Sequence, residues 1–178
     1  KIIQIAKKNQ YEVIIPLSLK SFSLFSKYRN LIDDNIRIVL PPSESMEIAS
    51  KKHKTFAYAG QNKISSPETI KINKKNLSSL KPFIEKIGFP LVVKGSISGV
   101  DNLKYCNNLT QLIFAIRKLL ENENVIICQE YIKGETHGFY AYYIDNKLHS
   151  YFMHKRIKQY PITGGPSSVA RSHYDNKL

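Results

Sequence analysis

Short apolar runs alternate with amphipathic stretches in the first third of the chain. The predicted strands are Tyr11–Pro16 and Ile36–Leu40, and the predicted helices are Leu17–Asp33 and a segment from Ser43 or Ser45 to Gly60. The strands are β-branched runs closed by proline, and we expect the first of them to be buried. The helices carry apolar residues at helical spacing, and a serine can cap the second one. Strand, helix, strand and helix in this order predict an α/β fold.

The remainder of the chain also contains both strand-like apolar runs and amphipathic helical stretches. Strands are predicted at Thr69–Ile72, Phe89–Lys94, Asn124–Tyr131, Gly138–Ile144 and Lys147–Lys155, helices at Asn76–Ile87 and Leu109–Leu120, and loops at Gly95–Gly99 and Tyr160–Ser168. The last two strands are separated by Asp145-Asn146, a pair that suits a tight hairpin turn. We therefore expect an α/β chain with an α+β part.

Composition places the chain in a reducing compartment. It has 178 residues, of which 42% are hydrophobic and only two are cysteines, so a disulfide framework is not expected. Every apolar run is shorter than the roughly 20 residues of a membrane helix, and the first residues do not resemble a secretion signal. We predict a cytoplasmic protein without a membrane partner. Because the sequence begins with Lys1, we expect its true start to lie upstream.

The strong positive charge admits several partners. Lysine and arginine number 27 against 14 acidic residues, which gives a formal net charge of +13. The lysines are scattered, arginine is sparse, and no recognition motif accompanies them. We therefore do not expect nucleic acid to be the main partner, although a basic nucleic-acid-binding protein remains one alternative. A phosphate-rich ligand is the other explanation of the charge.

Lys94 is a candidate phosphate ligand. The apolar strand before it delivers its ammonium into the loop Gly95–Gly99, where glycine lets backbone N–H groups approach phosphate oxygens. The P-loop pattern GxxxxGK[ST] is absent from the sequence. The alternative is a surface lysine that ends a hairpin strand.

The segment from Glu130 to Glu135 is a candidate adenosine site. A strand that runs into a connector at Glu130, Tyr131 and Ile132 can present a carbonyl and an N–H to adenine. Glu135 can accept both ribose hydroxyls, because a carboxylate has two oxygens. The alternative is a core strand followed by a turn with a solvated glutamate.

A third candidate combines Arg156 with a glycine-rich loop. The strand end His154-Lys155-Arg156 precedes the loop that contains Gly164-Gly165. Its cations could neutralise a phosphoryl group in transfer or hold a carboxylate substrate. The alternative is a rigid loop with a basic rim.

Together these segments resemble the ATP-grasp superfamily, in particular its carbamoyl-phosphate-synthase-like members. The stretches are FPLVVKGSISGV, ICQEYIKGETHG and HKRIKQYPITGGPSSV, and KKHKT followed by SPET resembles the DKxxT…PxT segment of the family. The resemblance covers nearly the whole chain. It implies an ATP-grasp fold preceded by the end of a Rossmann-like domain.

The resemblance also implies roles for individual residues. Lys52 and Lys94 would contact ATP phosphates, and the backbone of Glu130, Tyr131 and Ile132 would bind adenine. Glu135 would be a ribose ligand, and Arg156 would be catalytic. The implied enzyme is an ATP-dependent carboxylate–amine ligase that forms an acyl phosphate, with ATP and Mg²⁺ as cofactors, small carboxylate and amine substrates, and a possible homodimer.

The sequence departs from the family pattern at three places. Lys51 replaces the family's Asp, the loop after Lys94 is short, and Arg171 stands where an acidic residue is common. No metal ligand is predicted here, because the family's acidic residue and Glu-x-Asn would lie beyond Leu178. We therefore expect the chain to be inactive by itself. A non-catalytic nucleotide-binding or structural module is the remaining alternative.

These assignments divide the chain into four predicted parts. They are the end of the pre-ATP-grasp domain (1–43), connecting helices and a strand (44–88), the ATP-grasp lid (89–132) and the start of a truncated C-terminal catalytic subdomain (133–178).

Overall fold

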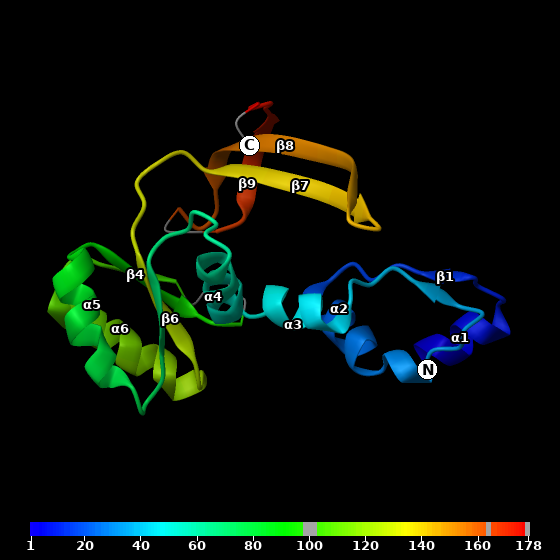
Figure 1. Cartoon of the computed structure of the whole chain (residues 1–178), viewed down its shortest axis with the longest axis horizontal. Coiled ribbons are helices and arrows are strands. Elements are labelled where there is room, and N and C mark those ends of the chain that lie inside the picture. Colours follow the sequence, from blue (N-terminus) through cyan, green and yellow to red (C-terminus); the bar gives the residue numbers. More distant parts are fainter. Residues whose placement is uncertain (98–102, 163–164, 177–178) are drawn as a thin grey trace. The chain divides into compact units, whose positions relative to one another are not determined.

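The computed structural model describes residues 1–97, 103–162 and 165–176 (Figure 1). Its described residues form two compact units. Unit 1 contains Lys1–Ser66 together with Ser96 and Ile97, and unit 2 contains Pro67–Gly95 and the described residues from Leu103 onward. The predicted boundaries after residues 43, 88 and 132 remain predictions. Among the described residues, no helix has both the length and the apolarity needed to cross a bilayer.

Unit 1 consists of short helices and one small parallel strand pair. Its elements are α1 (Ile2–Lys8), β1 (Val13–Ile14), α2 (Leu19–Lys27), η1 (Arg29–Leu31), β2 (Arg37–Ile38), α3 (Ser43–Ala49) and α4 (Lys52–Gln61). Strand β1 pairs with β2 in parallel. Helix α2 begins at Ser18, whose hydroxyl accepts the Ser21 N–H in a reciprocal cap. The predicted order of strand, helix, strand and helix is confirmed from β1 to α3, whereas α1 was not predicted.

Three expectations for unit 1 are wrong. The first strand is exposed rather than buried, since Val13 and Ile15 are 48% and 64% exposed. The helix expected to reach Gly60 is two helices, because Lys51 between them is extended. The first of these helices is capped by Pro42 without a side-chain hydrogen bond, so neither Ser43 nor Ser45 is its cap.

Unit 2 contains two antiparallel sheets. Its elements are β3 (Thr69–Ile72), η2 (Leu77–Ser79), α5 (Leu80–Ile87), β4 (Leu91–Gly95), β5 (Lys104–Cys106), α6 (Leu109–Asn122), β6 (Ile126–Glu130), β7 (His137–Ile144), β8 (Lys147–Gln159) and β9 (Ser167–Ser172). The four-stranded sheet has the order β3-β6-β4-β5, and the three-stranded sheet has the order β7-β8-β9. The mixed α/β fold class is therefore confirmed, with an α+β arrangement in this unit.

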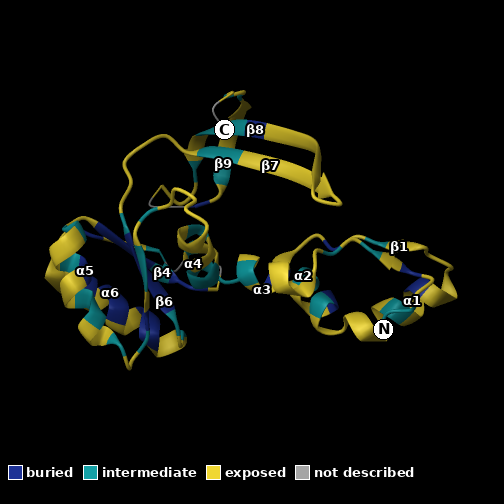
Figure 2. Ribbon diagram, viewed as in Figure 1, coloured by how far each residue is buried: buried dark blue, intermediate teal, exposed yellow. Residues whose placement is uncertain are grey.

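One face of the four-stranded sheet packs on α5 and α6. The apolar cluster joins Leu91, Val93, Ile126 and Cys128 of the central strands to residues of both helices. Figure 2 shows this buried material in dark blue along β4, β6 and α6. Helix α6 begins at Asn108, whose side chain accepts the Gln111 N–H at 3.0 Å. Burial of alternate strand residues against two amphipathic helices stabilises the sheet.

Most elements of unit 2 follow the sequence prediction. Strands β3, β4, β6, β7 and β8 and helices α5 and α6 lie within a few residues of the predicted ranges. Strand β5 was not predicted, and β9 begins at Ser167, inside the segment expected to be a loop. The hairpin turn is confirmed, because Asp145 and Asn146 both have positive φ (47° and 61°).

Candidate functional site

The register of the four-stranded sheet places Lys94 on the face that neither α5 nor α6 covers. Lys94 lies opposite Ile127, and Ile127 lies opposite Lys71. The next row on the same face contains Thr69, Gln129 and Val92, with Tyr105 at the edge. Directly opposed residues share a face of a sheet. Lys71 and Lys94 are therefore two cations in one row of this face.

A hydrogen-bonded chain crosses three strands on this face. The Lys94 Nζ donates to Gln129 Oε1 at 2.7 Å, and Gln129 Nε2 donates to Thr69 Oγ1 at 2.7 Å. Thr69 Oγ1 donates to the Pro67 carbonyl at 2.8 Å. Gln129 is buried and Lys94 is half-buried. The ammonium of Lys94 is thus held by a buried amide on the neighbouring strand.

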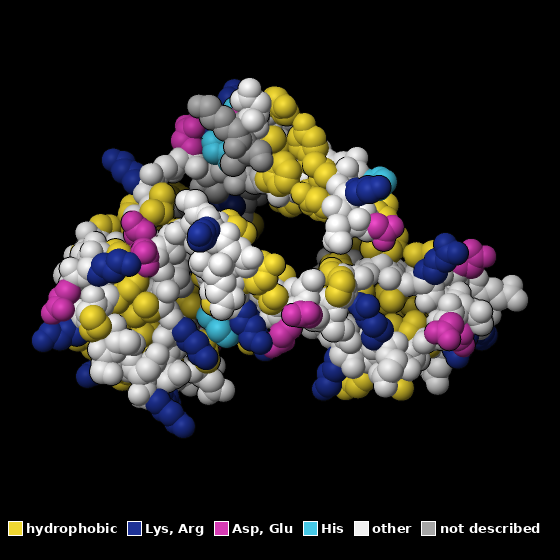
Figure 3. All heavy atoms as spheres, viewed as in Figure 1, with side chains coloured by type: hydrophobic (Ala, Val, Ile, Leu, Met, Phe, Trp, Pro, Cys, Tyr) yellow, Lys and Arg dark blue, Asp and Glu magenta, His cyan; other side chains and the backbone are white. Residues whose placement is uncertain are grey.

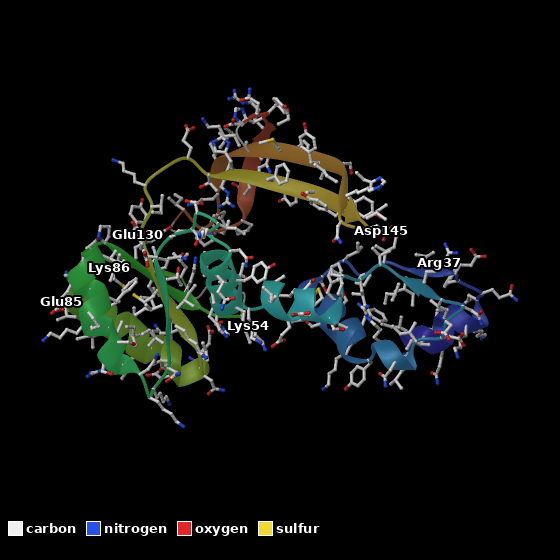
Figure 4. The ribbon with its side chains drawn as sticks, viewed as in Figure 1. Arg37, Lys54, Glu85, Lys86, Glu130 and Asp145 are labelled. Atoms are coloured by element: carbon white, nitrogen blue, oxygen red, sulfur yellow. The ribbon has the colours of Figure 1, made fainter. Side chains whose placement is uncertain are left out.

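The predicted adenine segment begins where β6 ends. Glu130 is the last residue of β6, and its main chain and carboxylate both contact Glu68, at 2.9 Å and 3.1 Å. Figure 4 labels Glu130 here. Tyr131 and Ile132 follow outside any strand or helix, and the Tyr131 ring meets Tyr105 edge-on at 5.7 Å. By strand alternation the Glu130 side chain lies on the face opposite Lys94. Its backbone N–H donates to the Glu68 carbonyl, so of its groups only the carbonyl suits the predicted role.

Glu135 and Arg156 line one hollow of about 900 Å³ in the region of β8. The hollow also includes Lys155 and Lys158, so three cations share it with one carboxylate. Arg156 Nη1 donates to Gln159 Oε1 and to the Gly165 carbonyl, both at 3.0 Å. Its Nε is buried and has no hydrogen-bond partner among the described residues. The hollow is therefore suited to an anionic ligand.

Glu135 already has a cationic partner. Its Oε1 accepts from Lys155 Nζ at 2.6 Å, and its Oε2 lies 3.7 Å from His137 Nε2. The hydrogen bond from Lys155 lowers the pKa of Glu135 from its ordinary value, and the nearby positive charge adds to this effect. A ribose at Glu135 would have to share this carboxylate with Lys155, so the ribose role remains a prediction.

Lys52 lies in unit 1, whereas the other predicted site residues lie in unit 2. It is the first residue of α4, and its backbone N–H donates to the Ser96 carbonyl at 2.9 Å. The imidazole of His53 also hydrogen-bonds the buried Ser96 hydroxyl. Ser96, in the glycine-flanked segment after Lys94, is thus hydrogen-bonded to the start of α4. Ser98 and Gly99 of that segment lie outside the described residues.

Lys51 pairs with an acidic residue of α3. Its Nζ and that of Lys54, labelled in Figure 4, each lie 2.6 Å from Glu47 Oε1. The two ammonium groups lower the pKa of Glu47 to about 2. These lysines therefore form ion pairs between α3 and the start of α4.

The described residues do not provide a magnesium site. Within residues 1–97, 103–162 and 165–176, no three His, Cys, Asp or Glu side chains are grouped so that they could hold a metal ion. Mg²⁺ prefers several oxygen ligands in octahedral geometry. The described residues therefore do not fit the expected Mg²⁺. Gly164 of the predicted Gly-Gly loop is outside the described residues as well.

Sequence reasoning missed Gln129 and Thr69. The sequence did contain a signal for Gln129, because it is a polar residue inside the apolar run NVIICQEY. A buried polar side chain in such a run needs a specific partner. The partner could not be predicted, since it depends on the register between β4 and β6.

No family model matches the sequence, and no curated protein matches it. Solved structures do match. The D-alanine–D-alanine ligase of Bacillus anthracis complexed with ATP has a TM-score of 0.69 and 20% identity, over 99% of this chain and 57% of that chain. The D-Ala:D-Ser ligase VanG of Enterococcus faecalis has a TM-score of 0.71 and 16% identity, over 91% and 48%. The fold corresponds to part of the ATP-grasp fold.

A third structure extends the ATP-grasp likeness to another kind of enzyme. The biotin carboxylase domain of the 2-oxoglutarate carboxylase of Hydrogenobacter thermophilus, a dimer bound to MgADP, ADP and bicarbonate, has a TM-score of 0.56 and 17% identity. It covers 76% of this chain, which covers 32% of that chain. The chain spans about half the length of the matched D-alanine–D-alanine and D-Ala:D-Ser ligases. The predicted ATP-grasp fold is confirmed at this level.

Proposed function

We propose that the chain is the ATP-binding part of an ATP-grasp ligase that activates a carboxylate as an acyl phosphate. The observation that carries the proposal is the position of Lys94, held beside Gln129 on the sheet face that α5 and α6 leave uncovered. The likeness of the whole chain to a ligase complexed with ATP supports it. Lys94 and Lys52 would contact phosphate oxygens as point charges.

The spacing along β6 suits a nucleoside. Glu130 lies three residues beyond Ile127, the partner of Lys94, which is about 10 Å at the rise of an antiparallel strand. An adenine at the backbone of Glu130, Tyr131 and Ile132 would leave its phosphates toward Lys94. Tyr105 and Tyr131 would supply apolar surface beside the base.

The proposed chemistry has two steps. An oxygen of the substrate carboxylate attacks the γ-phosphorus of ATP, and the bond from that phosphorus to the ADP oxygen breaks. An amine then attacks the acyl carbon, loses a proton and expels phosphate. Arg156, with the other cations of its hollow, would stabilise negative charge on the transferred phosphoryl group or on the acyl phosphate.

The substrate class is narrowed only by the sequence motifs. They favour a carbamoyl-phosphate-synthase-like carboxylate, while the solved structures reported above are D-alanine ligases and a biotin carboxylase domain. All of these proposals share the acyl phosphate intermediate. We also propose a homodimer, which light scattering of the purified chain would test.

A calorimetric titration with ATP tests the nucleotide site. We expect Lys94→Met to weaken binding about tenfold or more, because a charge-assisted contact to phosphate is lost. The matched control is Lys71→Met, which removes a second cation from the same row of the sheet. Its affinity should change by less than about threefold, the scale of an exposed charge pair.

Two outcomes would contradict the proposal. Equal affinities for the wild type and Lys94→Met would remove Lys94 from the site. Equal losses in Lys94→Met and Lys71→Met would indicate attraction by net charge alone, which a rise in salt would abolish for both.

A further inference from the structure

The hydrogen bonds around Gln129 fix which way its amide points. A hydroxyl has one proton to donate, and Thr69 donates it to the Pro67 carbonyl. Toward Gln129 the Thr69 oxygen is therefore an acceptor, so it must receive the amide nitrogen. The amide oxygen then points the other way and accepts from Lys94. The backbone carbonyl at one end thus determines what the ammonium meets at the other end.

The acceptor offered to Lys94 is rigid as well as oriented. Gln129 is 5% exposed and lies on β6, which is paired on one side with β3 and on the other with β4. A buried amide turned the other way would leave both ends of the chain mismatched, at a substantial cost. Lys94, by contrast, is a long side chain with many rotamers. Gln129 therefore favours the direction of the ammonium that meets its amide oxygen.

We propose that Gln129 is a positioning residue that holds the Lys94 ammonium in place for phosphate, with Thr69 setting its direction. This inference rests on the proposed nucleotide site. An ammonium has three N–H donors, so one bond to an amide is compatible with bonds to phosphate oxygens. A neutral acceptor orients the cation without cancelling its charge, whereas a carboxylate in the same place would compete with phosphate for it.

The direct test is the pH profile of Lys94 modification by an amine-reactive ester, followed by peptide mass spectrometry in the protein without nucleotide. In Gln129→Leu the charged form loses an acceptor, so the midpoint should fall by about one pH unit. In Gln129→Glu it should rise by a similar amount. Thr69→Val, which leaves the amide free to turn, should lower it by less. Lys71 in the same digest is the internal control, and its profile should not move.

Nucleotide titration of the same variants gives the second readout. We expect both Gln129→Leu and Gln129→Glu to weaken ATP binding about tenfold, the first by losing the position of the ammonium and the second by competing for its charge. A merely structural role would not shift the Lys94 midpoint in opposite directions in the two variants.

The outcomes separate the two proposals. Unchanged Lys94 midpoints in Gln129→Leu and Gln129→Glu, with wild-type circular dichroism, would overturn the positioning role. Shifted midpoints in a protein that does not bind ATP would support the hold on Lys94 and overturn the nucleotide site. If Gln129→Leu does not fold, Gln129→Glu and Thr69→Val still decide the question.

Discussion

The two sheets of unit 2 use similar strands in opposite ways. In the four-stranded sheet, Leu91, Val93, Ile126 and Cys128 are fully buried on the helix-covered face. In the three-stranded sheet, every residue from Phe139 to Ile144 is exposed. Figure 3 shows apolar side chains gathered over β7 and β8. Among the described residues of β7, β8 and β9, Met153 is the one hydrophobic side chain that is buried.

This difference shows that strand length is a poor guide to how much apolar surface a sheet buries. Strand β8 has 13 residues and β4 has five, yet the shorter strand has the apolar core. The three-stranded sheet is held by its backbone ladders and by contacts between rings, such as Phe139 on Tyr151 with centroids 5.7 Å apart. Ring pairs on an exposed surface contribute far less than burial of whole side chains.

The largest expected effect is the loss of a side chain from the core that α6 forms with the four-stranded sheet. Leu112 of α6 is fully buried, so Leu112→Ala should cost about 3 kcal/mol of unfolding free energy. The comparison in the three-stranded sheet is Phe152→Ala, because that ring is 54% exposed. This change should lower the free energy of unfolding by less than about 1 kcal/mol. Native-state hydrogen exchange of β6 and β8 amides would measure both. Equal losses would contradict the contrast between the sheets.

A smaller effect is expected from a substitution at Gly138, where the three-stranded sheet is closely packed. A Cβ on Gly138 would lie 2.2 Å from the His154 ring, which stacks against Tyr140 and Phe152. Gly138→Ala should therefore cost about 1–2 kcal/mol. Gly134→Ala is the control, because a Cβ there meets nothing within 4 Å. Thermal unfolding of the two variants makes the comparison, and adding His154→Ala to Gly138→Ala should recover most of the loss.

The smallest effect concerns pH. Because Lys155 lowers the pKa of folded Glu135 below its ordinary 4.5, the unfolded chain binds this proton first as the pH falls. The ion pair between Glu135 and Lys155 therefore stabilises the three-stranded sheet above pH 4.5. That stabilisation is lost as the pH falls from 4.5 through the lowered pKa of Glu135. Amides of β7 and β8 should exchange relatively faster at pH 3 than those of β6. Glu135→Gln, or high salt, should reduce the difference.

Local signals in the sequence predicted much of the fold. Helix α6 follows an Asn cap and an uninterrupted apolar stripe, and the hairpin follows Asp145-Asn146, so neighbouring residues suffice in both cases. The break before α4 could not be predicted this way. At that point the Lys52 N–H bonds the Ser96 carbonyl, which is 44 residues away in the sequence. Long-range contacts of this kind override periodicity.

In the candidate site, too, residues in local patterns could be predicted and residues that depend on long-range contacts could not. Lys94 was found because an ammonium at a strand end beside glycine is a local pattern. Gln129 and Thr69 were missed, since their roles depend on which strands are neighbours. The order β3-β6-β4 places β6 between two strands that both precede it in the sequence. Periodicity within each strand contains no information about that order.

The two buried thiols, Cys106 and Cys128, can report when the four-stranded sheet opens. Burial raises the pKa of Cys128 to about 12, with a further contribution from Cys106, and burial also raises the pKa of Cys106. A thiol must ionise before it can attack an alkylating reagent or form a mixed disulfide. Both sulfurs are therefore weakly reactive while the sheet is closed. Their labelling rate in untreated protein would count openings of this sheet without any introduced probe.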